Sequence, residues 1–87
     1  MSALTTYLDQ KNAFAKIFGR QALSLQNAQD RQAIANMIDS ELSPENLSCD
    51  GELPMSQVRA RYTKLTAAAT DLVKLDPSTA QYMYEFG

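Results

Sequence analysis

The chain has 87 residues, of which 45% are hydrophobic and 21% are charged, and its formal net charge is −2. This length has room for one compact domain, and the composition is typical of a globular protein rather than a disordered one. The lack of histidine and the single cysteine, Cys49, exclude an internal disulfide and remove the residues that most zinc sites and general bases use.

The first predicted helix covers residues 3–18. Its apolar residues recur at spacings of three and four, which places them on one helical face. They are Leu4, Tyr7, Leu8, Phe14, Ala15, Ile17 and Phe18. Gly19 follows directly, and glycine readily adopts the left-handed conformation in which helices commonly end.

A second helix is predicted over residues 27–42, followed by a loop over residues 43–53. Ile34, Met37, Ile38 and Leu42 share one face of this helix. The Ser43–Pro44 pair ends it, because a residue before proline is pushed out of the helical region. The loop is rich in serine, asparagine and aspartate and contains the Asp50–Gly51 turn signal.

The strongest pattern lies in residues 54–75, where apolar residues alternate at spacings of three and four over about three heptads. This predicts a long third helix and a candidate self-association seam. The seam consists of Met55, Val58, Tyr62, Leu65, Ala69 and Leu72. It is either the core of a single chain or a contact with a second chain, and the sequence leaves both interpretations open.

A short fourth helix is predicted over residues 77–86, after the Asp76–Pro77 boundary. The aromatic stretch within residues 82–86 is also compatible with a strand, but a lone strand has no partner. The fold class expected is all-α, a small antiparallel bundle of three main helices with a short C-terminal helix, in one domain over residues 1–87.

Charge is distributed unevenly along the chain. Residues 26–53 carry −5 and residues 54–75 carry +3. These segments either pair with each other inside the fold or each face an oppositely charged partner. If they pair internally, Arg59 and Arg61 beside the seam should reach the second helix at Asp30, Asp39 or Glu41.

The candidate partner-binding residues are the cations of the third helix and the aromatic residues of the tail. They are Arg59, Arg61, Lys64, Tyr82, Tyr84 and Phe86. Three cations in an acidic chain are a weak footprint for nucleic acid, so a DNA-binding regulator using the basic face of helix 54–75 is the alternative function. The favoured function is a non-enzymatic protein–protein interaction module, such as a small acidic adaptor, regulator or inhibitor, acting as a monomer or a homodimer.

No catalytic, cofactor-binding or metal-binding residue is expected. The three glycines are too sparse for a nucleotide-binding loop, and the carboxylates around Gly51 are too few for a calcium loop. An enzyme that uses serine, lysine or carboxylates remains a third hypothesis, as does a redox-sensing role for Cys49. The sequence shows neither a signal peptide nor a membrane span, so we expect a cytoplasmic protein.

Overall fold

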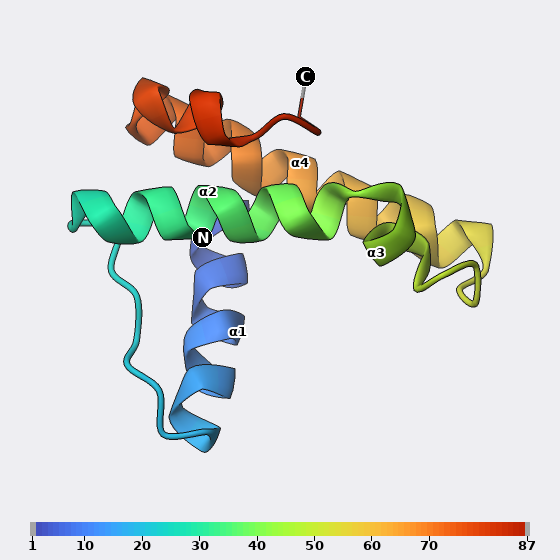
Figure 1. The fold of residues 1–87 in the computed structure, drawn as a ribbon, viewed down its shortest axis with the longest axis horizontal. Helices are drawn as coiled ribbons and strands as arrows, with labels where there is room; N and C mark the ends of the chain where they lie inside the picture. Colours follow the sequence, from blue (N-terminus) through green and yellow to red (C-terminus); the bar gives the residue numbers. More distant parts are fainter. Residues whose placement is uncertain (1, 87) are drawn as a thin grey trace.

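The computed structural model describes residues 2–86, and every regular element in that range is helical (Figure 1). The α-helices are α1 (Ala3–Ile17), α2 (Ala28–Leu42), α3 (Pro44–Ser48) and α4 (Met55–Leu75), and η1 (Pro77–Tyr82) is a 3-10 helix. The predicted all-α fold class is confirmed for these residues. The segment expected to be one loop, residues 43–53, contains the short helix α3.

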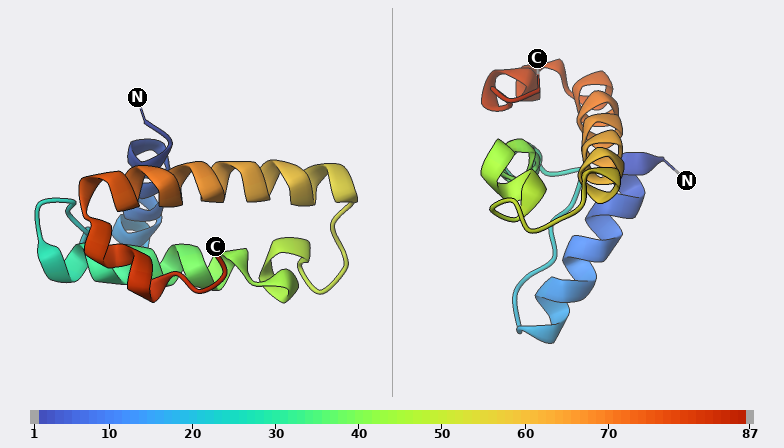
Figure 2. Two further views of the ribbon diagram at one scale, coloured as in Figure 1. Left: turned by 90° about the horizontal axis from the view of Figure 1, so that it is seen from above. Right: turned by 90° about the vertical axis from the view of Figure 1, so that its right-hand side faces the viewer.

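The long helix α4 is the element on which the rest of the chain packs. Helices α1, α2, α3 and η1 all contact it. Figures 1 and 2 show that α2 and α4 lie side by side with opposite directions, whereas α1 crosses them steeply and its second half projects away from them. An antiparallel bundle of three main helices is therefore not confirmed, since only α2 and α4 have that relationship.

The hydrophobic core lies where the first half of α1, α2, α4 and the C-terminal segment meet. Its members come from every helical element except η1, together with one residue that follows η1. They are Leu4, Leu8, Ile34, Ala35, Ile38, Leu42, Leu47, Leu65, Ala68, Ala69, Leu72 and Met83. Removing this apolar surface from water is the main stabilising contribution to the fold.

The observed helix starts fall one residue later than predicted at two places, because the predicted first residue is the cap. The side chain of Asn27 accepts hydrogen bonds from the backbone N–H groups of Gln29 and Asp30, as N-cap residues do. Asn27 and Pro54 both have extended backbones, with ψ of 125° and 152°. Residue 18, predicted to end the first helix, is the C-cap of α1.

The C-terminal segment is not the α-helix predicted over residues 77–86. After η1, residues 83–86 form neither helix nor strand. Met83 is buried in the core, and the backbone N–H of Glu85 donates to Oδ1 of Asp39 at 2.7 Å. These contacts with α2 hold the chain in an irregular path, so tertiary contacts override the local helical spacing.

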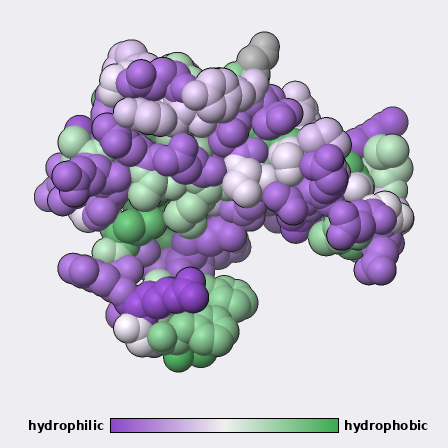
Figure 3. All heavy atoms as spheres, viewed as in Figure 1, coloured by the Kyte–Doolittle hydropathy of each residue, from purple (hydrophilic) through white to green (hydrophobic). Residues whose placement is uncertain are grey.

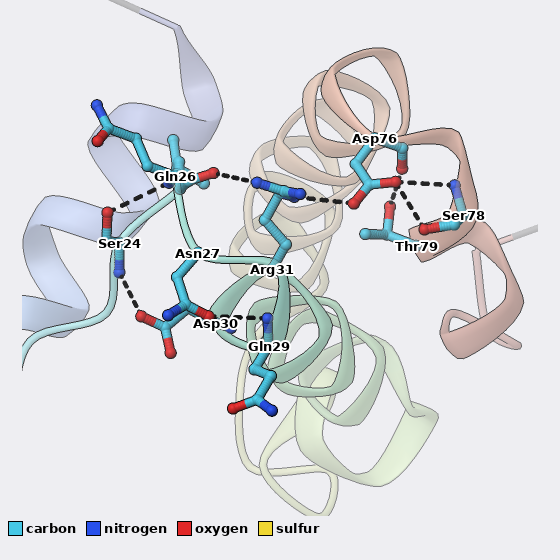
Figure 4. Close-up of polar contacts among 10 residues, drawn as sticks. Ser24, Gln26, Asn27, Gln29, Asp30, Arg31, Asp76, Ser78 and Thr79 are labelled. Carbon is cyan, nitrogen blue, oxygen red and sulfur yellow. Dashed lines mark hydrogen bonds and ion pairs between the residues drawn. The ribbon is translucent and has the colours of Figure 1, made fainter.

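Two polar clamps position the long linker between α1 and α2. The side-chain amide of Asn12 bonds both the N–H and the C=O of Leu23, each at 2.9 Å. At the other end of the linker, Arg31 donates from Nη1 to the carbonyl of Leu25 and from Nε to Asp76, each at 2.8 Å (Figure 4). The linker is therefore fixed to both α1 and α2.

Candidate functional site

The predicted seam of α4 divides into a buried half and an exposed half. Leu65, Ala69 and Leu72 are buried in the core of the single chain, and Val58 packs against that core. Met55 and Tyr62 are instead exposed by 64% and 51%. The seam therefore does not form one continuous surface that a second chain could cover.

The cations of α4 do not pair with the carboxylates of α2 as expected. Among residues 2–86, no ion pair joins Arg59 or Arg61 to Asp30, Asp39 or Glu41. Arg61 is half-buried, and its Nη2 donates to the carbonyl of Asn46 in α3 at 3.2 Å. The prediction was wrong because the Arg61 guanidinium bonds α3 instead, and both carboxylate oxygens of Glu41 are already bonded by Tyr7 and Lys11 of α1.

A shallow hollow between α1 and α4 contains two of the predicted partner-binding cations. Arg61 and Lys64 line it from α4, facing Tyr7, Gln10 and Lys11 of α1 and Glu41 of α2. The Tyr7 hydroxyl donates to Oε2 of Glu41, while Lys11 Nζ lies 3.0 Å from Oε1 of the same carboxylate. Burial, followed by this contact with Glu41, raises the pKa of Tyr7 well above its ordinary value of 10. Both carboxylate oxygens of Glu41 are bonded by side chains of α1, so Glu41 links α2 to α1 at this hollow.

The predicted aromatic tail is mostly part of the fold. Tyr82 and Phe86 are half-buried and pack against the core. Tyr84 alone points away, with 86% of its surface exposed. Of the three aromatic residues, only Tyr84 is free to anchor a partner.

A cluster of exposed apolar residues lies at the end of α1, and the sequence analysis did not identify it as a candidate site. Phe14, Ile17 and Phe18, which we call the apolar tip, are exposed by 64%, 76% and 66% at the projecting end of α1. Figure 3 shows this apolar surface on the part of the molecule that extends away from the α2–α4 pair. None of the three belongs to the core or packs against it.

Ring stacking and the hydrogen bonds of the helix end stabilise the apolar tip. The rings of Phe14 and Phe18 stack with centroids 6.0 Å apart. The helix ends in a Schellman motif, in which the N–H of Gly19 donates to Lys16 and the N–H of Arg20 donates to Ala15, at 3.1 and 2.7 Å. Gly19 has φ of 69°, the left-handed conformation that the motif requires.

Charged residues flank the apolar tip. Lys16 and Arg20 are exposed, and neither makes an ion pair with another residue of the described chain.

At the α3 end of the α2–α4 pair lies a surface of opposite sign, which we call the acidic turn. It consists of Glu45, Asp50 and Glu52, and the exposed Met55 follows three residues after Glu52 in the sequence.

Two searches of the described residues, one for clusters of metal-binding side chains and one for helices able to cross a membrane, find no candidate. No group of three or more cysteine, aspartate or glutamate residues in residues 2–86 is placed to hold a metal ion. No helix in the same range combines the length and apolar character needed to cross a bilayer.

In comparisons with known proteins, no family model matches the chain, and no curated protein or solved structure is significantly similar to it.

Proposed function

We propose that this protein is a non-enzymatic protein–protein interaction module, acting as an adaptor, regulator or inhibitor, and that the apolar tip of α1 is its docking element. The observation that carries the proposal is the exposure of Phe14, Ile17 and Phe18 together on one projecting helix end. Single exposed hydrophobic residues are ordinary on protein surfaces. A cluster of apolar side chains at a helix end, none of which packs against the core, is typical of an interaction site.

The spacing of the apolar tip fits a known mode of recognition. Phe14, Ile17 and Phe18 occupy positions i, i+3 and i+4, the anchor pattern of a helix that inserts into a hydrophobic groove. The stacked phenylalanines and the fixed end of α1 reduce the conformational entropy that binding would otherwise cost. The tip therefore suits a partner surface that offers apolar contacts to all three side chains.

The flanking charges indicate the chemistry of that partner. Lys16 and Arg20 stand beside the apolar side chains and have no carboxylate partner within residues 2–86. Acidic residues on the rim of the groove would attract them and increase the rate of association. The partner surface that fits is thus apolar in its centre and acidic at its edge.

The alternative of DNA binding through α4 has less support. Arg61 is engaged with Asn46 and half-buried, which leaves Arg59, Lys64 and Lys74 as the exposed cations of that helix. Three dispersed cations offer few phosphate contacts, and nonspecific affinity for DNA depends on their number. The apolar tip also has no role in that alternative.

Site-specific photocrosslinking in living cells tests the proposal. We expect Phe18→p-benzoylphenylalanine to give discrete adducts with a protein, whereas the same replacement of Tyr84, an exposed aromatic residue at another surface, gives none. Ile17→Asp should then raise the dissociation constant for the purified adduct partner by at least about tenfold. Adducts at position 84 but not at position 18, or none at either, would overturn the assignment of the tip.

A further inference from the structure

We propose that the partner of the apolar tip is a second copy of this chain, with the tip of each copy packed against the acidic turn of the other in a two-fold dimer. This inference rests on the proposed function, because it uses the same docking element. It does not use the candidate self-association seam of α4, since Leu65, Ala69 and Leu72 are buried within each copy.

The two surfaces are complementary in charge. Lys16 and Arg20 give the tip two positive charges, and the acidic turn carries three negative charges from Glu45, Asp50 and Glu52. The ion pairs within residues 2–86 are Lys11 with Glu41 and Arg31 with Asp76, so none of these five side chains has an ionic partner within that range. A contact between copies would bring the opposite charges together.

The fold prevents the same contact from forming within one copy. Figures 1 and 2 show the end of α1 projecting away from the α2–α4 pair, while α3 and the turn lie at one end of that pair. The linker clamps at Asn12 and Arg31 keep α1 in this position. Only another molecule can therefore place its acidic turn against the tip.

The acidic turn also offers apolar surface. Met55, the first residue of α4, is 64% exposed and lies three residues after Glu52 in the sequence. Its flexible thioether side chain packs readily against aromatic rings such as those of Phe14 and Phe18. The contact would thus have an apolar centre and a charged rim, as protein interfaces commonly do.

The exposed area favours a two-fold arrangement. Large aromatic side chains bury about 150–250 Å² each, so a tip of three side chains at about two-thirds exposure presents roughly 400 Å². A stable interface buries about 800 Å² on each partner. In a two-fold dimer each copy contributes a tip and receives one, which doubles the contact and reaches that range.

A charge exchange between two variants tests the dimer. In one variant, Lys16→Glu and Arg20→Glu reverse the charge beside the apolar tip. In the other, Glu45→Lys and Glu52→Lys reverse the charge of the acidic turn. Asp50 is left unchanged because its φ of 58° makes a substitution there a backbone change as well. The state of association is measured by light scattering over a dilution series, with circular dichroism to show that each variant remains helical.

We expect the wild-type chain to be a dimer that dissociates on dilution and in high salt. Each folded variant alone should dissociate at a concentration at least about tenfold higher, and an equimolar mixture should recover dimers because both contacts again join opposite charges. A wild-type chain that is monomeric throughout, a mixture that stays monomeric, or open-ended growth of the wild type would overturn the two-fold dimer.

The failure of this inference is separable from the failure of the proposed function. If the wild type is monomeric but the photoreactive residue at position 18 captures a different protein whose purified form binds through the tip, the second-copy proposal is wrong and the interaction module stands. If position 18 captures nothing and the chain is monomeric, both are wrong.

Discussion

Arg31 in the first turns of α2 donates a hydrogen bond to Asp76 at the end of α4, 2.8 Å away. The same guanidinium bonds the carbonyl of Leu25 in the linker, and the other oxygen of Asp76 accepts from Ser78 at the start of η1 (Figure 4). Two side chains therefore join the linker, α2, α4 and η1. This junction fixes the C-terminal end of the α1–α2 linker against α2, α4 and η1.

The junction predicts a stability that depends on acid pH. Hydrogen bonds from Ser78 and then Arg31 lower the pKa of Asp76 below its ordinary value of 3.8. Since the folded pKa is depressed, this stabilisation is present above the unfolded pKa and is lost as pH falls through the folded value. We expect Asp76→Asn to have a lower Tm than the wild type at pH 6 and the difference to shrink below about pH 4. Asp9→Asn, at an exposed position, is the control in thermal melting and should not show this convergence.

The contact of Tyr7 with Glu41 predicts that the free energy of unfolding also depends on pH in the alkaline range. Because the folded pKa of Tyr7 is raised, its contribution is complete below the unfolded pKa of about 10 and is lost as pH rises above that value. Tyr7→Phe should cost about 1–2 kcal/mol of unfolding free energy at pH 7, because a half-buried hydrogen bond to a carboxylate is lost. Denaturant unfolding at pH 7 and pH 11 measures both effects. An equal cost at the two values would contradict the assigned contact.

Adjacent positions on α4 separate core from surface. Leu65 is 6% exposed, and Leu65→Ala should lower the free energy of unfolding by about 2–5 kcal/mol because it leaves a cavity between α1, α2 and α4. Lys64 is exposed and without an ionic partner within residues 2–86, so Lys64→Ala should change it by no more than roughly 0.5 kcal/mol. Equal effects at both positions in denaturant titrations would mean that the buried stripe of α4 is misplaced.

The buried stripe of α4 was predictable because Leu65, Ala69 and Leu72 follow the helical period without a break. The period identifies a face but does not indicate how far the packed neighbours extend along it. Helices α2 and α3 leave Met55 and Tyr62 exposed at the first part of the same stripe. The sequence therefore predicted the spine of the fold better than the extent of its core.

The apolar tip was missed for a related reason. Residues 3–18 were treated as one amphipathic face, yet the positions three and four after Leu8 are Lys11 and Asn12, and the next apolar residue of that face is six positions later. This break marks the point where α1 leaves the core. Lys11 and Asn12 there bind Glu41 and Leu23, and everything beyond them projects. A polar interruption of the stripe was the signal that could have identified the tip.

Substitutions in the apolar tip should leave the fold intact. Ile17 is 76% exposed and contacts no core residue, so Ile17→Ser should change the free energy of unfolding by no more than roughly 0.5 kcal/mol. Leu8→Ser, on the buried part of the same helix, is the matched control and should be strongly destabilising, by about 3 kcal/mol or more. Chemical denaturation of the two variants checks this. A large loss at Ile17 would place the tip in the core rather than at a docking surface.

The backbone is strained at Cys49, next to the acidic turn, and a glycine at that position would relieve the strain. Cys49, the C-cap of α3, has φ of 49° and ψ of 53°, a left-handed conformation that costs most residues with a Cβ about 1 kcal/mol and costs glycine little. Cys49→Gly should therefore raise the free energy of unfolding by up to about 1 kcal/mol, less the extra entropy that glycine gives the unfolded chain. Ser48→Gly, one residue earlier and in the helical conformation, should instead lower the free energy of unfolding. Glycine has a lower helix propensity than serine, and the substitution removes the hydrogen bond from the Ser48 hydroxyl to the carbonyl of Pro44. If both substitutions destabilise the protein equally in thermal melts, the turn at residue 49 is not left-handed, and the exposed position of Asp50 and Glu52 that the dimer contact requires would have to be revised.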